Sequence, residues 1–277
     1  MLRRWCVLLA IVAMTAGTAL TAGTASAATG HAGLGGGGWP WPPPGTQSWV
    51  PGGPVNLVGR TFSQTNGQAQ STNWSGYAGT TGTYTSVSAS WIQPAGHCTG
   101  GDQYAAFWVG LDGYSSSTVE QTGSEVDCVG RTAEYYAWYE AYPNASVDYN
   151  NTVRAGDSFT ATVTYTTGNS FSLYIDDVTQ KWSHTTVVNV ANAKRSSAEV
   201  IAEAPCCTFF GGILPLTNFG TMNFTSSLAN GADLGAAGGL TTITMVDNFG
   251  RDKDTVSALT PSGATGQNFG CTFVRST

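Results

Sequence analysis

Carboxylate and amide side chains are the groups in this sequence whose spacing could do chemistry. The segment AEVIAE, residues 198–203, carries two glutamates, and side chains two residues apart on a strand point to the same face. Glu199 and Glu203 would therefore share one face with Ile201. Two acids on one face are unusual in a chain with so few charges. A catalytic face and a solvated outer face both explain them, and this segment alone favours neither.

Two aromatic segments place further polar side chains on common faces. In EYYAWYEAYP, residues 134–143, Trp138 and Glu140 share a face, and aromatic residues on both faces predict a central strand. Burial in such a strand would raise the pKa of Glu140. In FWVGLDG, residues 107–113, Trp108 and Asp112 share a face. Each strand alone is typical of a protein core.

The segment TVEQTGSE, residues 118–125, adds an amide. Gln121 would face away from Glu120, and Glu125 is expected beyond a turn at Gly123. A concave sheet that brought these polar and aromatic side chains together would form a groove with aromatic walls. Its lining would be Trp108, Asp112, Gln121, Trp138, Glu140 and Glu203.

Other kinds of site have little support. The sequence has no G-x-S-x-G motif, and its three histidines, His31, His97 and His184, stand in unrelated settings. No C-x-x-C pair is present, so we expect no metal site. The net charge of −6 and the lack of a basic run exclude nucleic acid as an electrostatically favoured partner.

The elements that must position these side chains are strands. From about residue 66 to 277, short runs rich in Val, Ile, Thr, Tyr, Phe and Trp alternate with Gly, Asn, Asp and Ser, and no stretch has a helical period. This pattern predicts one all-β domain, an antiparallel sandwich or barrel. Residues 1–27 are typical of a signal peptide ending in Ala-Ser-Ala, and the Gly/Pro-rich residues 28–65 of a linker or pro-segment.

A secreted chain can form disulfides, and cleavage of the signal would leave five of its six cysteines. Cys98 and Cys128 flank the segments around Asp112 and Gln121, so we expect them to pair. Cys271 would then pair with Cys206 or Cys207. Only 10% of residues are charged, against about 25% in an average protein, and this composition suits an acidic medium.

The order of the motifs resembles the glutamic peptidases, the eqolisin family of acid endopeptidases. NWSGY, AFWVGLDG, TVEQTG, YYAWYEAYP and AEVIAE follow one another between Asn73 and Glu203, and the resemblance is to a secreted, bacterial-type member. It implies a β-sandwich of two large bent antiparallel sheets with the substrate on the concave face. It also implies hydrolysis of polypeptides in acid, insensitivity to pepstatin and no cofactor. We further expect a monomer that, once the signal is removed, does not bind membranes.

The resemblance also assigns residues. The family's catalytic glutamine corresponds to Gln121 and its catalytic glutamate to Glu203. Glu203 would take a proton from the attacking water, and Gln121 would stabilise the oxyanion. Side chains expected to line or support the cleft are Trp74, Trp108, Asp112, Trp138 and Glu140.

The sequence departs from the family at Tyr136, where fungal members carry an aspartate, and at the adjacent Cys206 and Cys207. Two alternatives remain: a β-sandwich glycoside hydrolase with Glu140 and Glu203 as its acid pair, or a carbohydrate-binding module without activity.

Overall fold

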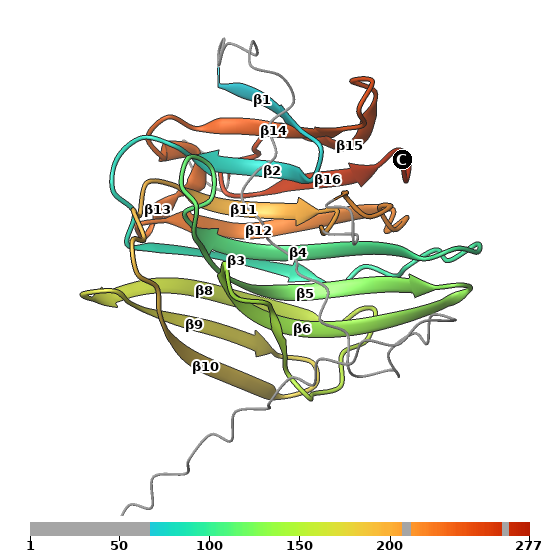
Figure 1. Ribbon diagram of the computed structural model, residues 1–277, viewed down its shortest axis with the longest axis horizontal. Coiled ribbons are helices and arrows are strands. Elements are labelled where there is room, and N and C mark those ends of the chain that lie inside the picture. Colours follow the sequence, from blue (N-terminus) through green and yellow to red (C-terminus); the bar gives the residue numbers. More distant parts are fainter. Residues whose placement is uncertain (1–66, 207–211, 262–265) are drawn as a thin grey trace, which may run out of the picture. The chain divides into compact units, whose positions relative to one another are not determined.

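Strands dominate the computed structural model, which describes residues 67–206, 212–261 and 266–277 (Figure 1). The predicted signal peptide and linker, residues 1–27 and 28–65, lie outside the described residues and stay predictions. The one helical element among the described residues is a short 3₁₀ turn, η1 (Leu234–Ala236). The strands are β1 (Gln68–Ser71), β2 (Trp74–Gly79), β3 (Ser86–Ile92), β4 (Gln103–Leu111), β5 (Val119–Val129), β6 (Thr132–Tyr142), β7 (Val147–Asp148), β8 (Ser158–Thr167), β9 (Ser170–Asp177), β10 (Trp182–Asn189), β11 (Ala198–Glu203), β12 (Thr221–Ala229), β13 (Ala232–Asp233), β14 (Thr241–Val246), β15 (Asp252–Val256) and β16 (Phe269–Phe273).

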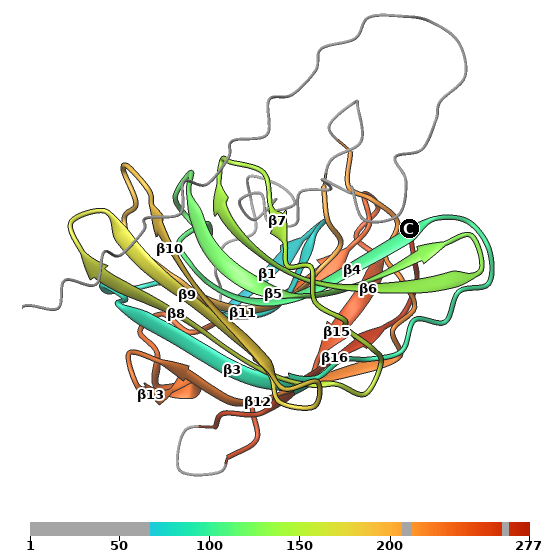
Figure 2. The same cartoon turned by 90° about the horizontal axis from the view of Figure 1, so that it is seen from below.

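The described strands are joined in one hydrogen-bonded path. Its order is β10-β9-β8-β3-β12-β16-β15-β14-β2-β11-β4-β5-β6-β7, and each pairing along it is antiparallel. Off the path, β1 pairs with β14 in parallel. In Figure 2, β4, β5 and β6 lie in a layer over β3, β8 and β12, and both layers bend the same way. The predicted antiparallel sandwich is confirmed, with its two layers continuous through hydrogen-bonded neighbours.

Burial patterns explain how the layers pack. Along β3, β8 and β9 every second side chain is buried, as expected for strands with one face on a core and one in solvent. Along β2, β4 and β11 both faces are buried, which agrees with the nearly continuous apolar and small residues of β2 and β4; in β11 the buried residues include Glu199 and Glu203. The larger core, between the layers, includes Trp91, Phe107, Phe159, Phe171 and Phe224.

A smaller apolar cluster covers the opposite, concave face of β2, β4, β5, β6 and β11. We call it the tryptophan cluster; it contains Trp74, Trp108, Trp138, Ile201 and Ile243. This face carries the side chains of interest.

The position of β6 differs from the prediction. Beyond it the path has only the two-residue β7, which pairs at Trp138 and Tyr139. The predicted central strand is therefore next to the edge, and its residues Tyr135, Tyr136 and Tyr139 are only partly buried.

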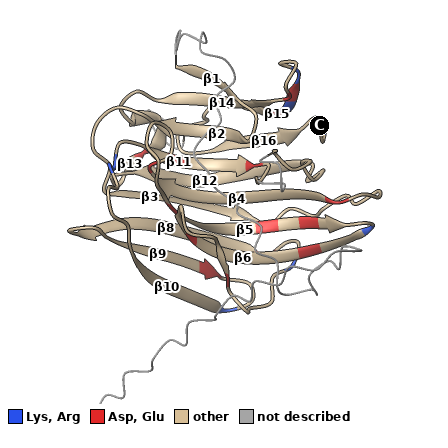
Figure 3. Ribbon diagram, in the orientation of Figure 1, with Lys and Arg blue, Asp and Glu red and all other residues tan. Residues whose placement is uncertain are grey.

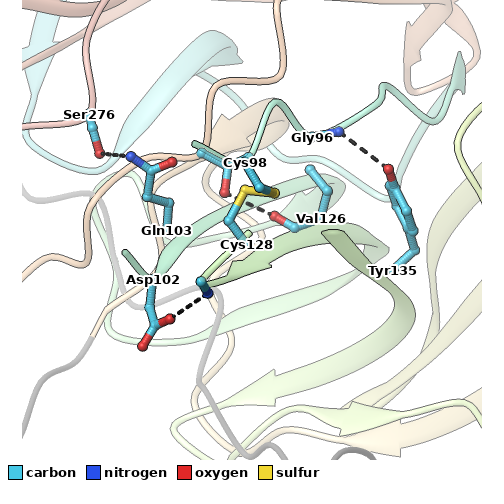
Figure 4. Close-up of a disulfide and its surroundings, with 10 residues drawn as sticks. Gly96, Cys98, Asp102, Gln103, Val126, Cys128, Tyr135 and Ser276 are labelled. Carbon is cyan, nitrogen blue, oxygen red and sulfur yellow. Dashed lines mark hydrogen bonds between the residues drawn. A yellow bond between two sulfur atoms is a disulfide. The ribbon is translucent and has the colours of Figure 1, made fainter. Parts of the chain in front are cut away.

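The disulfide between Cys98 and Cys128 confirms one expected pairing. It ties the segment before β4 to the end of β5, where Cys128 also faces Gln103 in the strand register (Figure 4). A backbone N–H of Gly130 donates to Asp102 at 2.9 Å beside it.

The second expected pairing is wrong, because Cys271 is a free, buried cysteine. It lies in β16 between β12 and β15, with its sulfur 3.7 Å from the carbonyl oxygen of Ser75. This interior position keeps it away from Cys206, which is disulfide-bonded, while Cys207 lies outside the described residues.

Candidate active site

Gln121 and Glu140 form one half of the candidate site. They face each other across β5 and β6, and Gln121 Nε2 donates a 2.6 Å hydrogen bond to Glu140 Oε2. Both side chains are fully buried. Burial raises the pKa of Glu140 well above its usual value, and the nearby charge of Glu203 raises it further, against the lowering effect of the Gln121 bond. The expected rise of this pKa is confirmed.

Glu203 forms the other half. It is the last residue of β11, is fully buried and receives two N–H donors. Trp108 Nε1 donates to Oε2 at 2.8 Å, and Asn73 Nδ2 donates to Oε1 at 3.3 Å. Charge-assisted bonds of this kind fix a carboxylate and stabilise its ionised form.

Asn73 is itself held by the turn between β1 and β2. The hydroxyl of Ser71 donates to Asn73 Oδ1 at 2.8 Å, which leaves the amide nitrogen directed at Glu203. The same hydroxyl oxygen accepts the backbone N–H groups of Asn73 and Trp74. Asn73 was not among the site residues expected from the sequence, although it begins the NWSGY motif.

Strand register sets the two halves on one face. Glu199, Gly110, Gln121 and Glu140 face one another in a row across β11, β4, β5 and β6. Glu203 lies two rows away on the same face, and between them run Ile201, Trp108, Gly123 and Trp138. The charge of Glu203 acts on Glu140 across this row of tryptophans.

Gly123, two residues after Gln121 in β5, lies where the structure leaves no room for a side chain. A Cβ there would lie 2.1 Å from the carbonyl oxygen of Phe107 and 2.6 Å from Cβ of Trp108, closer than any real contact. Its role is to let β4 and its tryptophan approach, and no turn forms there, since β5 continues through Val129. The expected turn at Gly123 is wrong.

The tryptophans make the apolar floor of the site. Trp74 meets Trp108 edge to face with ring centroids 4.9 Å apart, and Trp138 is fully buried beside Gly123. The indole Nε1 atoms of Trp74 and Trp138 have no hydrogen-bond partner among the described residues. Two buried N–H donors of the tryptophan cluster therefore lack an acceptor in the part of the chain that the structure describes.

Asp112 supports the site from outside it. Its carboxylate accepts the backbone N–H groups of Lys194, Arg195 and Ser196 at 2.7–2.9 Å, and the Ser196 hydroxyl at 3.0 Å. These bonds hold the loop that enters β11, the strand of Glu203. A supporting role for Asp112 stays a prediction, with which these bonds agree.

A second group of carboxyls shares the face and was missed from the sequence. Because β5 continues past Gly123, Glu125 and Asp127 lie on the same side as Gln121, and Figure 3 shows acidic segments side by side on β5 and β6. Burial raises the pKa of Glu125 to about 7 and that of Asp127 well above its usual value. Tyr136 stands where fungal members of the family carry an aspartate, and its hydroxyl donates to Glu134.

Glu120 lies on the face opposite to Gln121, as predicted from the sequence. It faces Leu111 and Ala141, both of the larger core, and burial with the charge of Asp112 raises its pKa to about 8.

Within the described part of the chain, no group of His, Cys, Asp and Glu could hold a metal ion. There is also no helix, among the described residues, long and apolar enough to cross a membrane.

Known proteins are similar to this chain in fold and in sequence. The model of the Peptidase A4 family matches residues 72–273. Aspergillopepsin-2 of Aspergillus niger is 29% identical over 252 residues, which cover 82% of this chain and 85% of that protein. Scytalidopepsin B of Scytalidium lignicola is 34% identical over 130 residues, 45% of this chain and 48% of that protein. The structure of scytalido-glutamic peptidase with a transition state analog inhibitor covers 73% of this chain and 98% of its own, with 25% identity and a TM-score of 0.62.

The fold and these matches define a peptidase of the glutamic class. The chain belongs to the Peptidase A4 family, the eqolisins, and is an endopeptidase of the glutamic type. Membership in this family decides against the glycoside hydrolase and the carbohydrate-binding module. Aspergillopepsin-2 and scytalidopepsin B come from fungi, so the bacterial type stays a prediction.

Proposed function

We propose that this chain is a secreted acid endopeptidase in which Glu203 activates water and Gln121 stabilises the oxyanion. The observation that carries the proposal is convergence: a carboxylate held by two N–H donors and an amide held by a carboxyl occupy one tryptophan-lined face. The substrates would be polypeptides, cleaved outside the cell.

Glu203 has the geometry of a general base. Trp108 and Asn73 donate to one oxygen each, so both oxygens are oriented before substrate arrives. The carboxylate takes a proton from water as the water attacks the scissile carbonyl, and then returns the proton to the leaving nitrogen. A glutamate ordinarily ionises near pH 4.3, which suits a base that works in acid.

Gln121 supplies what a carboxylate lacks, an N–H donor. An amide NH₂ has two N–H bonds, and the one donated to Glu140 fixes the plane in which the group lies. A donor fixed before the reaction stabilises the developing oxyanion without reorganisation.

Glu140 completes the charge balance. Its raised pKa keeps it protonated in acid, so the site then carries one negative charge, that of Glu203, where an oxyanion must form. Above that pKa a second negative charge would lie beside Gln121 and oppose the oxyanion. Loss of activity on the alkaline side follows from this arrangement.

The test is hydrolysis of casein at acidic pH by Glu203→Gln and Gln121→Ala, with and without pepstatin. We expect each substitution to lower kcat by about 100-fold or more, and wild-type activity to be unaffected by pepstatin. Near wild-type rates in either folded variant would refute the assignment, and inhibition by pepstatin would refute the proposed insensitivity.

A further inference from the structure

A pocket of about 390 Å³ lies beside the strand end that carries Glu203. It is lined in part by Thr72, which precedes Asn73, and by Leu214. The backbone N–H of Leu214 donates to the carbonyl oxygen of Pro205 at 2.9 Å, two residues after Glu203. Two walls of this pocket are therefore continuous with the segments that hold the proposed base.

Lys253 of β15 lines the same pocket and is only 5% exposed. Its ammonium group has no hydrogen-bond or ion-pair partner among the described residues, whose one ion pair joins Arg251 to Asp247. Thr277 also lines the pocket and forms no ion pair with Lys253. We call this site the Lys253 pocket.

Asp247 is an acid whose charge acts on Lys253, but its carboxylate already has other partners. Its Oδ1 accepts the backbone N–H groups of Phe249 and Arg251, and its Oδ2 accepts Arg251 Nε at 2.5 Å. Burial lowers the pKa of Lys253 to about 8, and Asp247 offsets only part of that shift. Lys253 is thus a cation throughout the acidic range, and no carboxylate among the described residues forms an ion pair with it.

A cation on a mostly buried side chain without an ion-pair partner is unfavourable, and the anion that a polypeptide offers is a carboxylate. We propose that the Lys253 pocket binds a carboxylate of the peptide substrate, either an acidic side chain or the C-terminal carboxylate. The proposal rests on the proposed function and names a preference of that same site. It makes Lys253 a specificity-determining residue, because its pocket adjoins the segments that hold Glu203, and neither Glu203 nor Gln121 lines it.

The experiment uses a set of internally quenched neutral peptides. A single Asp is moved through each position on both sides of the cleaved bond, each peptide has an Asn counterpart, and one pair differs only in a free or amidated C terminus. Rates are measured at about pH 5, where a substrate Asp is ionised and Lys253 is charged. The readout is the ratio of kcat/KM for the carboxylate and the neutral member of each pair.

We expect one position, or the free C terminus, to be preferred by about 10-fold, as for a hydrogen bond to a charged group. Lys253→Met should reduce that ratio to about one. Lys181→Met, a matched control at an exposed turn lysine, should keep it. The absence of any carboxylate preference in the wild type, or its persistence in Lys253→Met, overturns the proposal.

A binding measurement separates this proposal from the proposed function. Failure of the wild type to cleave any peptide of the set would refute the function. Fluorescence anisotropy of the same peptides on Glu203→Gln and on the double variant Glu203→Gln/Lys253→Met would still test the pocket. Tighter binding of the carboxylate member only where Lys253 is present supports it, and equal binding refutes it.

Discussion

Glu120→Gln should make the protein more stable at neutral pH and leave its stability in acid nearly unchanged. Glu120 is fully buried against the larger core, and its pKa rises from 4.5 to about 8 through burial and the charge of Asp112. Below 4.5 the carboxyl is protonated in both states and costs nothing. As the pH rises from 4.5 towards 8, the unfolded chain releases the proton while the folded chain keeps it, so stability is lost.

The size of the effect follows from the shift. Each pKa unit corresponds to about 1.4 kcal/mol, so at about pH 7 the wild type has lost about 3 kcal/mol through this one group. Glutamine has nearly the same shape and cannot ionise, so the variant escapes the loss. For a domain of this size that difference corresponds to a rise in Tm of about 6–12 °C.

Urea unfolding followed by circular dichroism at several pH values would measure the difference in unfolding free energy between the wild type and Glu120→Gln. Asp252→Asn, which removes an exposed carboxyl of β15, is the control and should leave the pH dependence of the unfolding free energy as it is. If Glu120→Gln has the same pH dependence as the wild type, or is less stable at neutral pH, then Glu120 is ionised in the fold and the reasoning is refuted.

Three further predictions concern the site and the Lys253 pocket. Trp108→Phe removes the 2.8 Å donor to Glu203 and should lower kcat by about 10–100-fold at acidic pH while the fold is kept; unchanged kcat would contradict the role of that bond. Gly123→Ala should lower Tm and activity together, because a Cβ would overlap the Phe107 carbonyl oxygen, and calorimetry with a casein assay would reveal any tolerance. Lys253→Met should raise the unfolding free energy below about pH 8 by about 3 kcal/mol, because the depressed pKa makes the buried ammonium unfavourable there; a loss of stability in urea unfolding would show that Lys253 is paired.

Much of the site followed from the alternation of side chains along strands. The period of two correctly separated Gln121 from Glu120 and put Trp138 with Glu140, because β5 and β6 run straight through these positions. Neighbours along a strand are decided by local geometry, which a sequence shows directly.

Contacts between distant segments could not be read in this way. Asn73 reaches Glu203 across 130 residues of sequence, and only the pairing of β2 with β11 brings them together. Gly123 indicated a turn because glycine is common in turns, whereas here it makes room for Trp108. Because a turn was expected at Gly123, Glu125 was not recognised as a residue on the same face as Gln121. Cys271 was expected to pair because it was one of the cysteines left over after Cys98 and Cys128, and only its position inside β16 shows why it stays free.

The low charge content predicts an acidic working medium, and the carboxyls of the fold give that prediction a more specific physical basis. Among the described residues, the pKa is raised for eight carboxyls and lowered for Asp247 alone. The eight are Glu120, Glu125, Asp127, Glu140, Asp148, Asp177, Glu199 and Asp254.

Each raised carboxyl favours the folded state below its unfolded pKa and loses that stability as the pH rises towards its folded pKa. Burial raises the folded-state pKa values of Glu120, Glu125, Asp148, Asp177 and Asp254 to between about 6 and about 8, so unfolding should become easier between weakly acidic and neutral pH. Glu140 belongs to the same set, so the titration that weakens the fold also adds charge beside Gln121. Activity and stability should therefore fall together on the alkaline side. A urea midpoint that is constant from about pH 4 to about pH 7 would show instead that these carboxyls are ionised in the folded protein.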